Sequence, residues 1–158
     1  MTQTVYTSLR NLKQTRYDRL LVQIQAKVAE IDGVVQKKDR LEQELENLIE
    51  LFPKRKRQID KELLTGKVNR EVFEEIGYRV MSLEHEISAH RLKIKAQEEL
   101  IEKLRKELAE LNLARVALTK VLEKYDILIE LDQKEQKRVR EHIEDKELEE
   151  FAKSMTQP

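Results

Sequence analysis

The sequence contains no cysteine and no tryptophan, and only three of its 158 residues are glycine and two are proline. Without cysteine the chain has no disulfide framework, no thiolate ligand for zinc and no thiol nucleophile. No apolar run exceeds three residues, whereas a transmembrane helix needs roughly 20. The first residues also lack the apolar stretch and cleavage site of a secretory signal. From these absences we expect a soluble intracellular protein in a reducing compartment.

Charge is abundant but balanced, with 31 basic and 31 acidic side chains. This balance gives no reason to expect nucleic acid as a main partner. Charged residues make up 39 % of the chain, against about 25 % in an average domain, and Ala, Glu, Lys, Leu and Arg dominate, which is typical of a coiled coil or a long helix. Aromatic residues are scarce, as in many disordered chains, but 39 % apolar residues and a net charge of zero argue against disorder.

The few turn formers divide the chain into two long helices. Gly66 lies between two helical patterns, and glycine is favoured just past a helix end because it adopts a left-handed backbone. Asn69 is placed to cap the next helix, with Glu71 in its first turn. We therefore expect helix one at about 8–64, a turn at 65–69, helix two at about 70–150 and a tail at 151–158.

Helix two carries a heptad pattern sustained over about seven repeats, which is typical of a left-handed coiled coil. The a seam consists of Val80, Ile87, Ile94, Ile101, Leu108, Arg115, Leu122 and Ile129. The d seam consists of Ile76, Leu83, His90, Gln97, Leu104, Leu111, Leu118 and Tyr125.

Helix one has the same period. We assign its a seam to Leu21, Val28, Val35, Glu42, Ile49, Lys56 and Leu63. We assign its d seam to Tyr17, Ile24, Ile31, Lys38, Leu45, Phe52 and Ile59. This stripe is widened on one side by Leu20, Val34, Leu41 and Leu48.

A short turn between two long helices makes them antiparallel neighbours. Residues that lie level then have a constant sum of residue numbers, and the position of the turn allows a sum of 139 or of 132. The sum of 139 pairs Phe52 with Ile87, Leu45 with Ile94, and Ile31 with Leu108. Glu42 meets Gln97 in that register and His90 in the other. Either polar layer costs stability but fixes the alignment.

The sequence thus predicts an all-α fold: a long antiparallel two-helix coiled-coil hairpin, one domain over 1–158, with the second helix overhanging at the C-terminus. Helix one runs out of length near the level of residue 130. Basic side chains at 134–140 and acidic ones at 141–150 follow. The apolar residues beyond that level are Leu131, Val139, Ile143, Leu148 and Phe151. A solvated tail and a helix that docks in another protein both account for this overhang.

Two features of helix one stand out. Pro53 removes a backbone donor, so we expect a kink near Ile49–Phe52 in a continuous helix. The basic run at 54–57 follows it. A solvated stretch and a contact with an acidic partner or nucleic acid both account for this run.

Catalytic and metal-binding motifs are missing from the pattern. His85 and His90 resemble the histidine pair of a zinc-protease helix, but they are five residues apart, about 140° around a helix, instead of four. No glycine-rich phosphate loop is present, and a two-helix hairpin offers no deep, water-excluding cleft. We therefore expect no enzyme, no catalytic residue, no cofactor and no metal site.

Two local stretches resemble a known family. Residues 83–91 have the spacing Leu-Glu-x-x-Ile-x-x-His-Arg, and residues 145–152 end in an acidic residue followed by Phe151 and Ala152. With these stretches and its length and layout, the chain resembles the type III secretion central-stalk family, which includes the flagellar FliJ and injectisome YscO proteins.

The resemblance implies a cytoplasmic, non-enzymatic stalk in the central hole of a hexameric secretion ATPase. It also implies contacts with the export gate protein at the cytoplasmic face of the inner membrane and with secretion chaperones, without membrane insertion. On this basis the terminal ends of the two helices would dock in the ATPase, and the hairpin tip and the mid-coil would face the gate. The candidate partner-binding residues are Tyr6, Leu9, Val139, Ile143, Leu148 and Phe151 at the ends, and Leu83 and His90 in the mid-coil.

Two other functions remain open. A generic coiled-coil scaffold or chaperone-like protein would act as a dimer through the widened stripe of helix one. A DNA-associated coiled coil would use the basic run at 54–57. Pro53 and this run have no counterpart in the family pattern, so they leave the gate-side contacts of helix one undefined.

Overall fold

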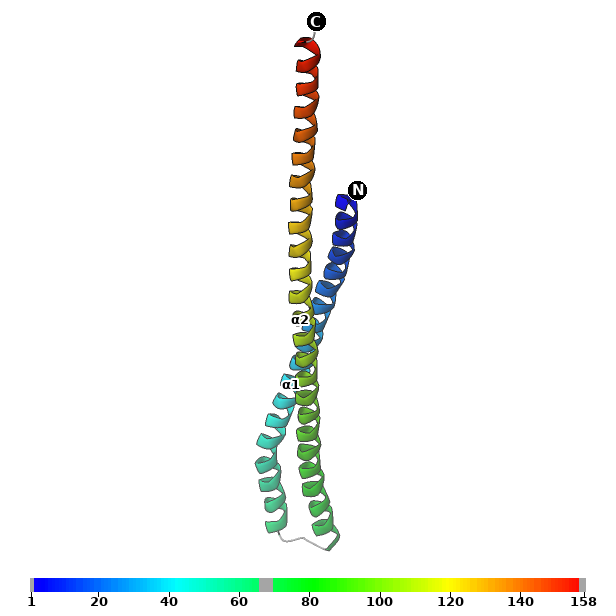
Figure 1. Ribbon diagram of the computed structural model, residues 1–158. Helices are drawn as coiled ribbons and strands as arrows, with labels where there is room; N and C mark the ends of the chain where they lie inside the picture. Colours follow the sequence, from blue (N-terminus) through cyan, green and yellow to red (C-terminus); the bar gives the residue numbers. More distant parts are fainter. Residues whose placement is uncertain (1, 66–69, 157–158) are drawn as a thin grey trace. The chain divides into compact units, whose positions relative to one another are not determined.

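The computed structural model describes residues 2–65 and 70–156, and within these ranges it contains two α-helices and no strand (Figure 1). Helix α1 is Thr2–Leu64 and helix α2 is Arg70–Thr156. Both therefore extend about six residues beyond the bounds expected at the chain ends. Thr65 closes α1, because its N–H donates to the Lys61 carbonyl at 3.2 Å and its hydroxyl to the Glu62 carbonyl at 2.9 Å. The rest of the predicted turn, with Gly66 and Asn69, lies outside the described residues.

The chain divides into two compact units, each pairing part of α1 with part of α2. Unit 1 consists of Met1–Ile24 and Glu110–Pro158, and unit 2 of Gln25–Ala109. The two long helices pack against each other, which confirms the predicted all-α two-helix hairpin.

The seam of α2 is as predicted. Every a and d position assigned from the sequence is buried or half-buried, including the polar His90, Gln97 and Arg115. The most buried are Leu104, 3 % exposed, and Leu83, 4 % exposed, both in unit 2. A heptad period sustained over about seven repeats was therefore sufficient to identify the packed face of this helix, although three of its positions are polar.

The seam of α1 differs from the prediction by one position. Its d residues from Tyr17 to Ile59 are buried or half-buried, but Val28, Glu42, Ile49 and Lys56 of the predicted a seam are exposed. Their place is taken by the stripe on the other side of d: Leu20, Lys27, Val34, Leu41 and Leu48, all half-buried.

The physical reason lies in the polar residues of the two competing stripes. The predicted stripe would bury Glu42 and Lys56, whereas the observed one contains Lys27 and, one heptad after Leu48, Arg55, which is exposed. A lysine can bury its aliphatic stem and extend its ammonium group to the edge. The Lys27 Nζ does this and lies 2.8 Å from Glu107 Oε2.

The register also differs from both predicted sums. In unit 2, Lys27 pairs with Glu107 and Glu44 with His90, which gives 134, and Lys38 pairs with Glu98, which gives 136. In unit 1, Arg10 pairs with Asp126, again 136. A register of about 135 places Ile31 level with Leu104 and Phe52 level with Leu83. The residues of α2 that were predicted to face α1 therefore lie about one helical turn from the residues that do face it. The reason is that the predicted a seam of α1 is shifted by one residue from the stripe that packs against α2.

The predicted polar layer around Glu42 is wrong for the same reason. Glu42 is exposed and its carboxylate lies 3.5 Å from Lys38 Nζ. Lys38 itself occupies the seam, level with Gln97, and its Nζ is also 3.5 Å from Glu98. The polar layer therefore exists, but a lysine with acidic neighbours at the rim forms it.

Candidate protein-docking site

Beyond α1, helix α2 continues without a partner among the described residues of unit 1. Since Arg10 pairs with Asp126, Thr2 lies level with about residue 134. Gln136 is the last half-buried residue of α2, and every side chain from 137 to 156 is exposed. We call residues 137–156 the overhang. At about 1.5 Å per residue, it is roughly 30 Å of helix.

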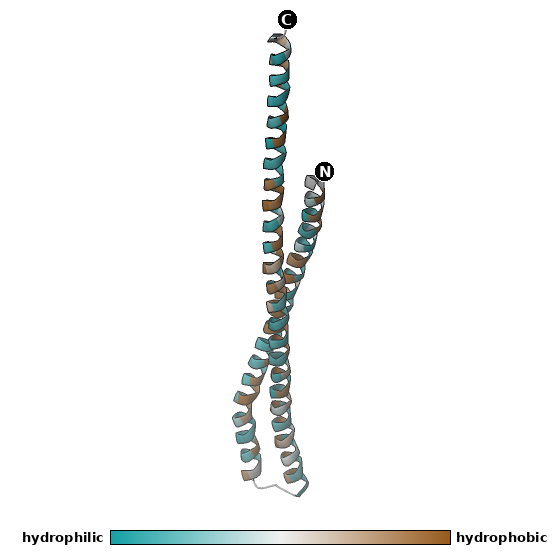
Figure 2. Ribbon diagram, in the orientation of Figure 1, coloured by the Kyte–Doolittle hydropathy of each residue, from teal (hydrophilic) through white to brown (hydrophobic). Residues whose placement is uncertain are grey.

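Hydrophobic residues recur among the hydrophilic ones along the overhang (Figure 2), and their spacing places them on two faces of the helix. Val139 and Ile143 are four residues apart and continue the line of the hairpin seam. Leu148 follows Ile143 by five residues, about 140° further around the helix. Phe151 and Met155 share its face, since spacings of three and four residues keep side chains together. Leu148 is 65 % and Phe151 62 % exposed. Sequence reasoning missed Met155, although the spacing 148, 151 and 155 carries the signal.

Charge along the overhang changes sign as predicted from the sequence. Arg138 forms an exposed ion pair with Glu135 at 3.0 Å, just before the boundary. Within the described residues, none of the acidic side chains from Glu141 to Glu150 forms an ion pair. The acidic half of the overhang is therefore available to a partner of opposite charge.

The N-terminal candidates lie in the same unit but at a different level. Tyr6 is half-buried and Leu9 is exposed, and the pair of Arg10 with Asp126 places them level with about residues 127–130. Val139 is roughly ten residues further along α2. Tyr6 and Leu9 therefore do not form one patch with the apolar residues of the overhang.

The two mid-coil candidates are less accessible than expected. Leu83 is in the core of unit 2 and only 4 % exposed, so its side chain offers little surface to a partner while the hairpin is intact. His90 is at the rim, where its Nε2 lies 3.1 Å from Glu44 Oε2 and its Nδ1 lies 3.1 Å from the Glu86 carbonyl. A shallow groove beside His90 is lined by Glu44, Asn47, Leu48, Leu51 and Glu86.

The ion pair of Lys27 and Glu107 is the one place in the described chain with perturbed titration. The hydrogen bond to Glu107 raises the pKa of Lys27, against a smaller opposing effect of desolvation. The same hydrogen bond lowers the pKa of Glu107. Because both shifts come from one structural contact at the seam, they point to packing and not to catalysis.

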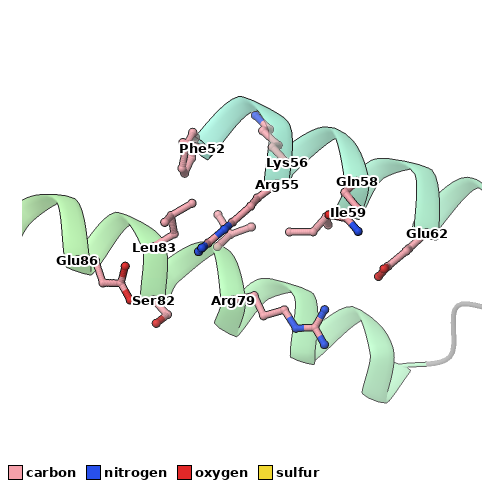
Figure 3. Close-up of a pocket in the computed structure, with 11 residues that line it drawn as sticks. Phe52, Arg55, Lys56, Gln58, Ile59, Glu62, Arg79, Ser82, Leu83 and Glu86 are labelled. Carbon is pink, nitrogen blue, oxygen red and sulfur yellow. The ribbon is translucent and has the colours of Figure 1, made fainter. Parts of the chain in front are cut away.

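A cleft of about 380 Å³ opens between the helices of unit 2, where Phe52, the residue before Pro53, forms part of its lining (Figure 3). Its apolar lining is Phe52, Ile59, Val80 and Leu83, and its charged lining is Arg55, Lys56, Glu62, Arg79 and Glu86. Arg55 extends from α1 toward α2 (Figure 3). In the observed stripe Arg55 comes one heptad after Leu48. The seam therefore has an arginine at a position where an apolar side chain would otherwise complete the layer. The sequence prediction missed this cleft because it had placed Arg55 outside the seam.

A second hollow, of about 470 Å³, lies along unit 1. Small and apolar side chains form most of it, with Arg16 and Arg19 at its edge. Its other lining residues are Leu20, Gln23, Ala114, Ala117, Leu118 and Val121. Such a surface can accept an additional helix.

Over residues 2–65 and 70–156, no group of three or more acidic or histidine side chains could hold a metal ion. In the same ranges, neither helix has a stretch long and apolar enough to cross a membrane. Comparison of the chain with models of protein families, with curated proteins and with solved structures finds no match. The resemblance to the type III secretion central-stalk family therefore depends on residues 83–91, residues 145–152 and the layout of the chain.

Proposed function

We propose that the chain is a non-enzymatic central-stalk component of a type III protein secretion apparatus. In this role it couples the hexameric secretion ATPase to the export gate and to the chaperones that deliver substrates, at the cytoplasmic face of the inner membrane. The observation that carries the proposal is the overhang, a helix of exposed apolar and charged side chains that α1 does not cover.

The physical argument starts from the stability of a lone helix. About 20 residues of helix without tertiary packing are marginal in water, and most helices in proteins are stabilised by burying an apolar face. Within the described chain, no other helix buries the side chains of Leu148 and Phe151. Insertion into a ring of subunits would bury them and stabilise the helix.

Charge supports the same role. The overhang presents a basic band at 137–140 and an acidic band at 141–150. Complementary bands inside a ring would orient the stalk and speed its association. A pair of helices also transmits contact between partners at its two ends better than a flexible linker does.

The gate-side contact is better assigned to the rim than to the core. Since Leu83 is buried, we place this contact on the groove beside His90, where Asn47 and Leu51 are exposed. His90 is half-buried and lines this groove, so it remains in the proposed site, whereas Leu83 does not line the groove. No particular surface is assigned to the chaperones.

A pull-down with purified secretion ATPase tests the proposal. Leu148→Ser combined with Phe151→Ser should abolish capture and leave the melting temperature of the hairpin unchanged. Leu113→Ser is the matched control, because Leu113 is 71 % exposed on the paired part of α2 in the same unit. Equal capture of both variants and the unchanged chain would refute ATPase docking through the overhang.

A dimeric scaffold or chaperone-like protein is the second candidate, and the hollow along unit 1 favours it. Two copies could pack their apolar hollows together, with Ala114, Ala117 and Val121 allowing close approach of the helices. Light scattering coupled to size-exclusion chromatography distinguishes the candidates. A dilute monomer supports the stalk, and a stable dimer that persists in high salt supports the scaffold.

A further inference from the structure

The basic run at 54–57 has no acidic partner in the described part of the chain. All four side chains are exposed, and none forms an ion pair or hydrogen bond. Two of them, Arg55 and Lys56, line the cleft of unit 2 together with Arg79. Glu62, Glu86 and Arg79 complete the charged lining, and Arg79 is itself paired with Glu75 at 2.9 Å. The cleft thus combines an apolar floor with the unpaired positive charge of Arg55 and Lys56.

The acidic half of the overhang is complementary to this cleft. Glu141, Glu144, Asp145, Glu147, Glu149 and Glu150 are exposed and unpaired within the described chain. The apolar stripe of Leu148, Phe151 and Met155 lies on the same stretch of helix. An acidic amphipathic helix is the kind of ligand that a basic, apolar-floored cleft between two helices would bind.

We propose that residues 141–156 of one copy dock as a helix in the cleft of a second copy. The lengths match: Phe52 and Ile59 on the floor are seven residues apart, and so are Leu148 and Met155. Both spacings are two helical turns, about 10.5 Å. The entering helix would restore the apolar layer that Arg55 interrupts, and its carboxylates would pair with Arg55 and Lys56.

The occupant is a second copy because the geometry of α2 excludes the chain's own segment. Residues 87–140 of α2 are helical without a break, which leaves no loop through which the segment could fold back onto its own cleft. The interface joins two different surfaces, so a pair of copies still has one free cleft and one free overhang. Association should therefore be open-ended, rise with protein concentration and weaken with salt.

This inference is independent of the proposed secretion role, because it concerns the purified chain alone. It has one consequence for that role. A docked overhang is withheld from any other partner, so self-association and ATPase binding would compete for the same residues.

Sedimentation velocity of the full chain over a range of concentrations provides the test. The weight-average mass should rise with concentration at about 50 mM salt, and the apparent dissociation constant should increase about tenfold or more at about 500 mM salt. Phe151→Ala should weaken association about tenfold or more, as expected for a buried aromatic anchor. Leu113→Ala, the matched control, should leave association unchanged. A chain that stays monomeric under all these conditions would overturn the proposal.

Charge reversal makes the test specific to the two surfaces. One variant changes residues 54–57 to Glu, and the other changes Glu141, Glu144, Glu147 and Glu150 to Lys. Each alone carries like charge on both of its surfaces and should stay monomeric. Their mixture should associate, because the intact overhang of one variant is complementary to the intact cleft of the other and the two reversed surfaces are again opposite in charge. Circular dichroism confirms folding, and Gln versions replace any variant that unfolds. Self-association retained by both variants, or a mixture without complex, would show that these surfaces do not bind each other.

Discussion

Up to Gln136 helix α2 has α1 beside it, and from residue 137 to Thr156 the same helix has no partner within the described chain. The paired part keeps one heptad phase from Ile76 to Gln136. The overhang keeps that phase only to Ile143 and then places its apolar residues on another face. A partner within the chain thus fixes the phase of a helix, and a change of phase marks where a different partner is expected. Four predictions test this contrast between the paired part and the overhang.

The largest expected effect is in the paired part. Leu104→Ala should lower the free energy of unfolding by about 2–5 kcal/mol, because it leaves a cavity beside Ile31 in the most buried layer. Leu148→Ala, the same change in the overhang, should cost less than about 0.5 kcal/mol. Urea denaturation measures both. Similar losses for the two variants would mean that the overhang packs within the hairpin.

The next effect is on binding. Phe151→Ala should weaken the proposed docking in the ATPase by about 2 kcal/mol or more, since a truncated aromatic anchor often dominates an interface. Isothermal titration with the purified ATPase measures the change. Phe73→Ala is a control with an equally exposed phenylalanine in unit 2. Equal losses of binding free energy for Phe73→Ala and Phe151→Ala would show that the overhang has no special role in docking.

A smaller effect concerns helix propensity. A Cβ added at Gly33 would meet no atom within 4 Å, so Gly33→Ala in α1 should stabilise the hairpin by about 1 kcal/mol. Ala152→Gly in the overhang should reduce helical content by circular dichroism without changing the main melting transition. A main melting transition that shifts in both Gly33→Ala and Ala152→Gly would contradict the claim that the overhang unfolds separately from the paired part.

The smallest effect is on pH dependence. Because hydrogen bonding to Lys27 lowers the pKa of Glu107, this contact contributes stability above the ordinary value of 4.5, and that stability is lost as the pH falls further below it. The raised pKa of Lys27 gives the alkaline counterpart, with stability present below 10.5 and lost above it. Glu107→Gln should flatten the acid side of a plot of melting temperature against pH. Glu147→Gln in the overhang should leave that plot unchanged.

How far the sequence predicts this molecule depends on the region. The α2 seam was readable because its two stripes contain few polar residues. In α1, two stripes flank the d seam with similar apolar content, and only the layers of α2 decide between Leu41 and Glu42 as the packed residue. The register of about 135 and the cleft at Arg55 depend on that choice, so neither could be predicted. Predicting the overhang required only the lengths of the two helices, so the sequence predicted it in outline.

Hydrogen exchange of the dilute chain, with and without the purified secretion ATPase, tests the central claim most directly. Alone, the amides of 137–156 should exchange rapidly, while those around Leu104 are protected. With the ATPase, the amides of 137–156 should become protected and those around Leu104 should not change. Exchange in 137–156 that is unaffected by the ATPase, with new protection only in unit 2, would contradict the docking of the overhang.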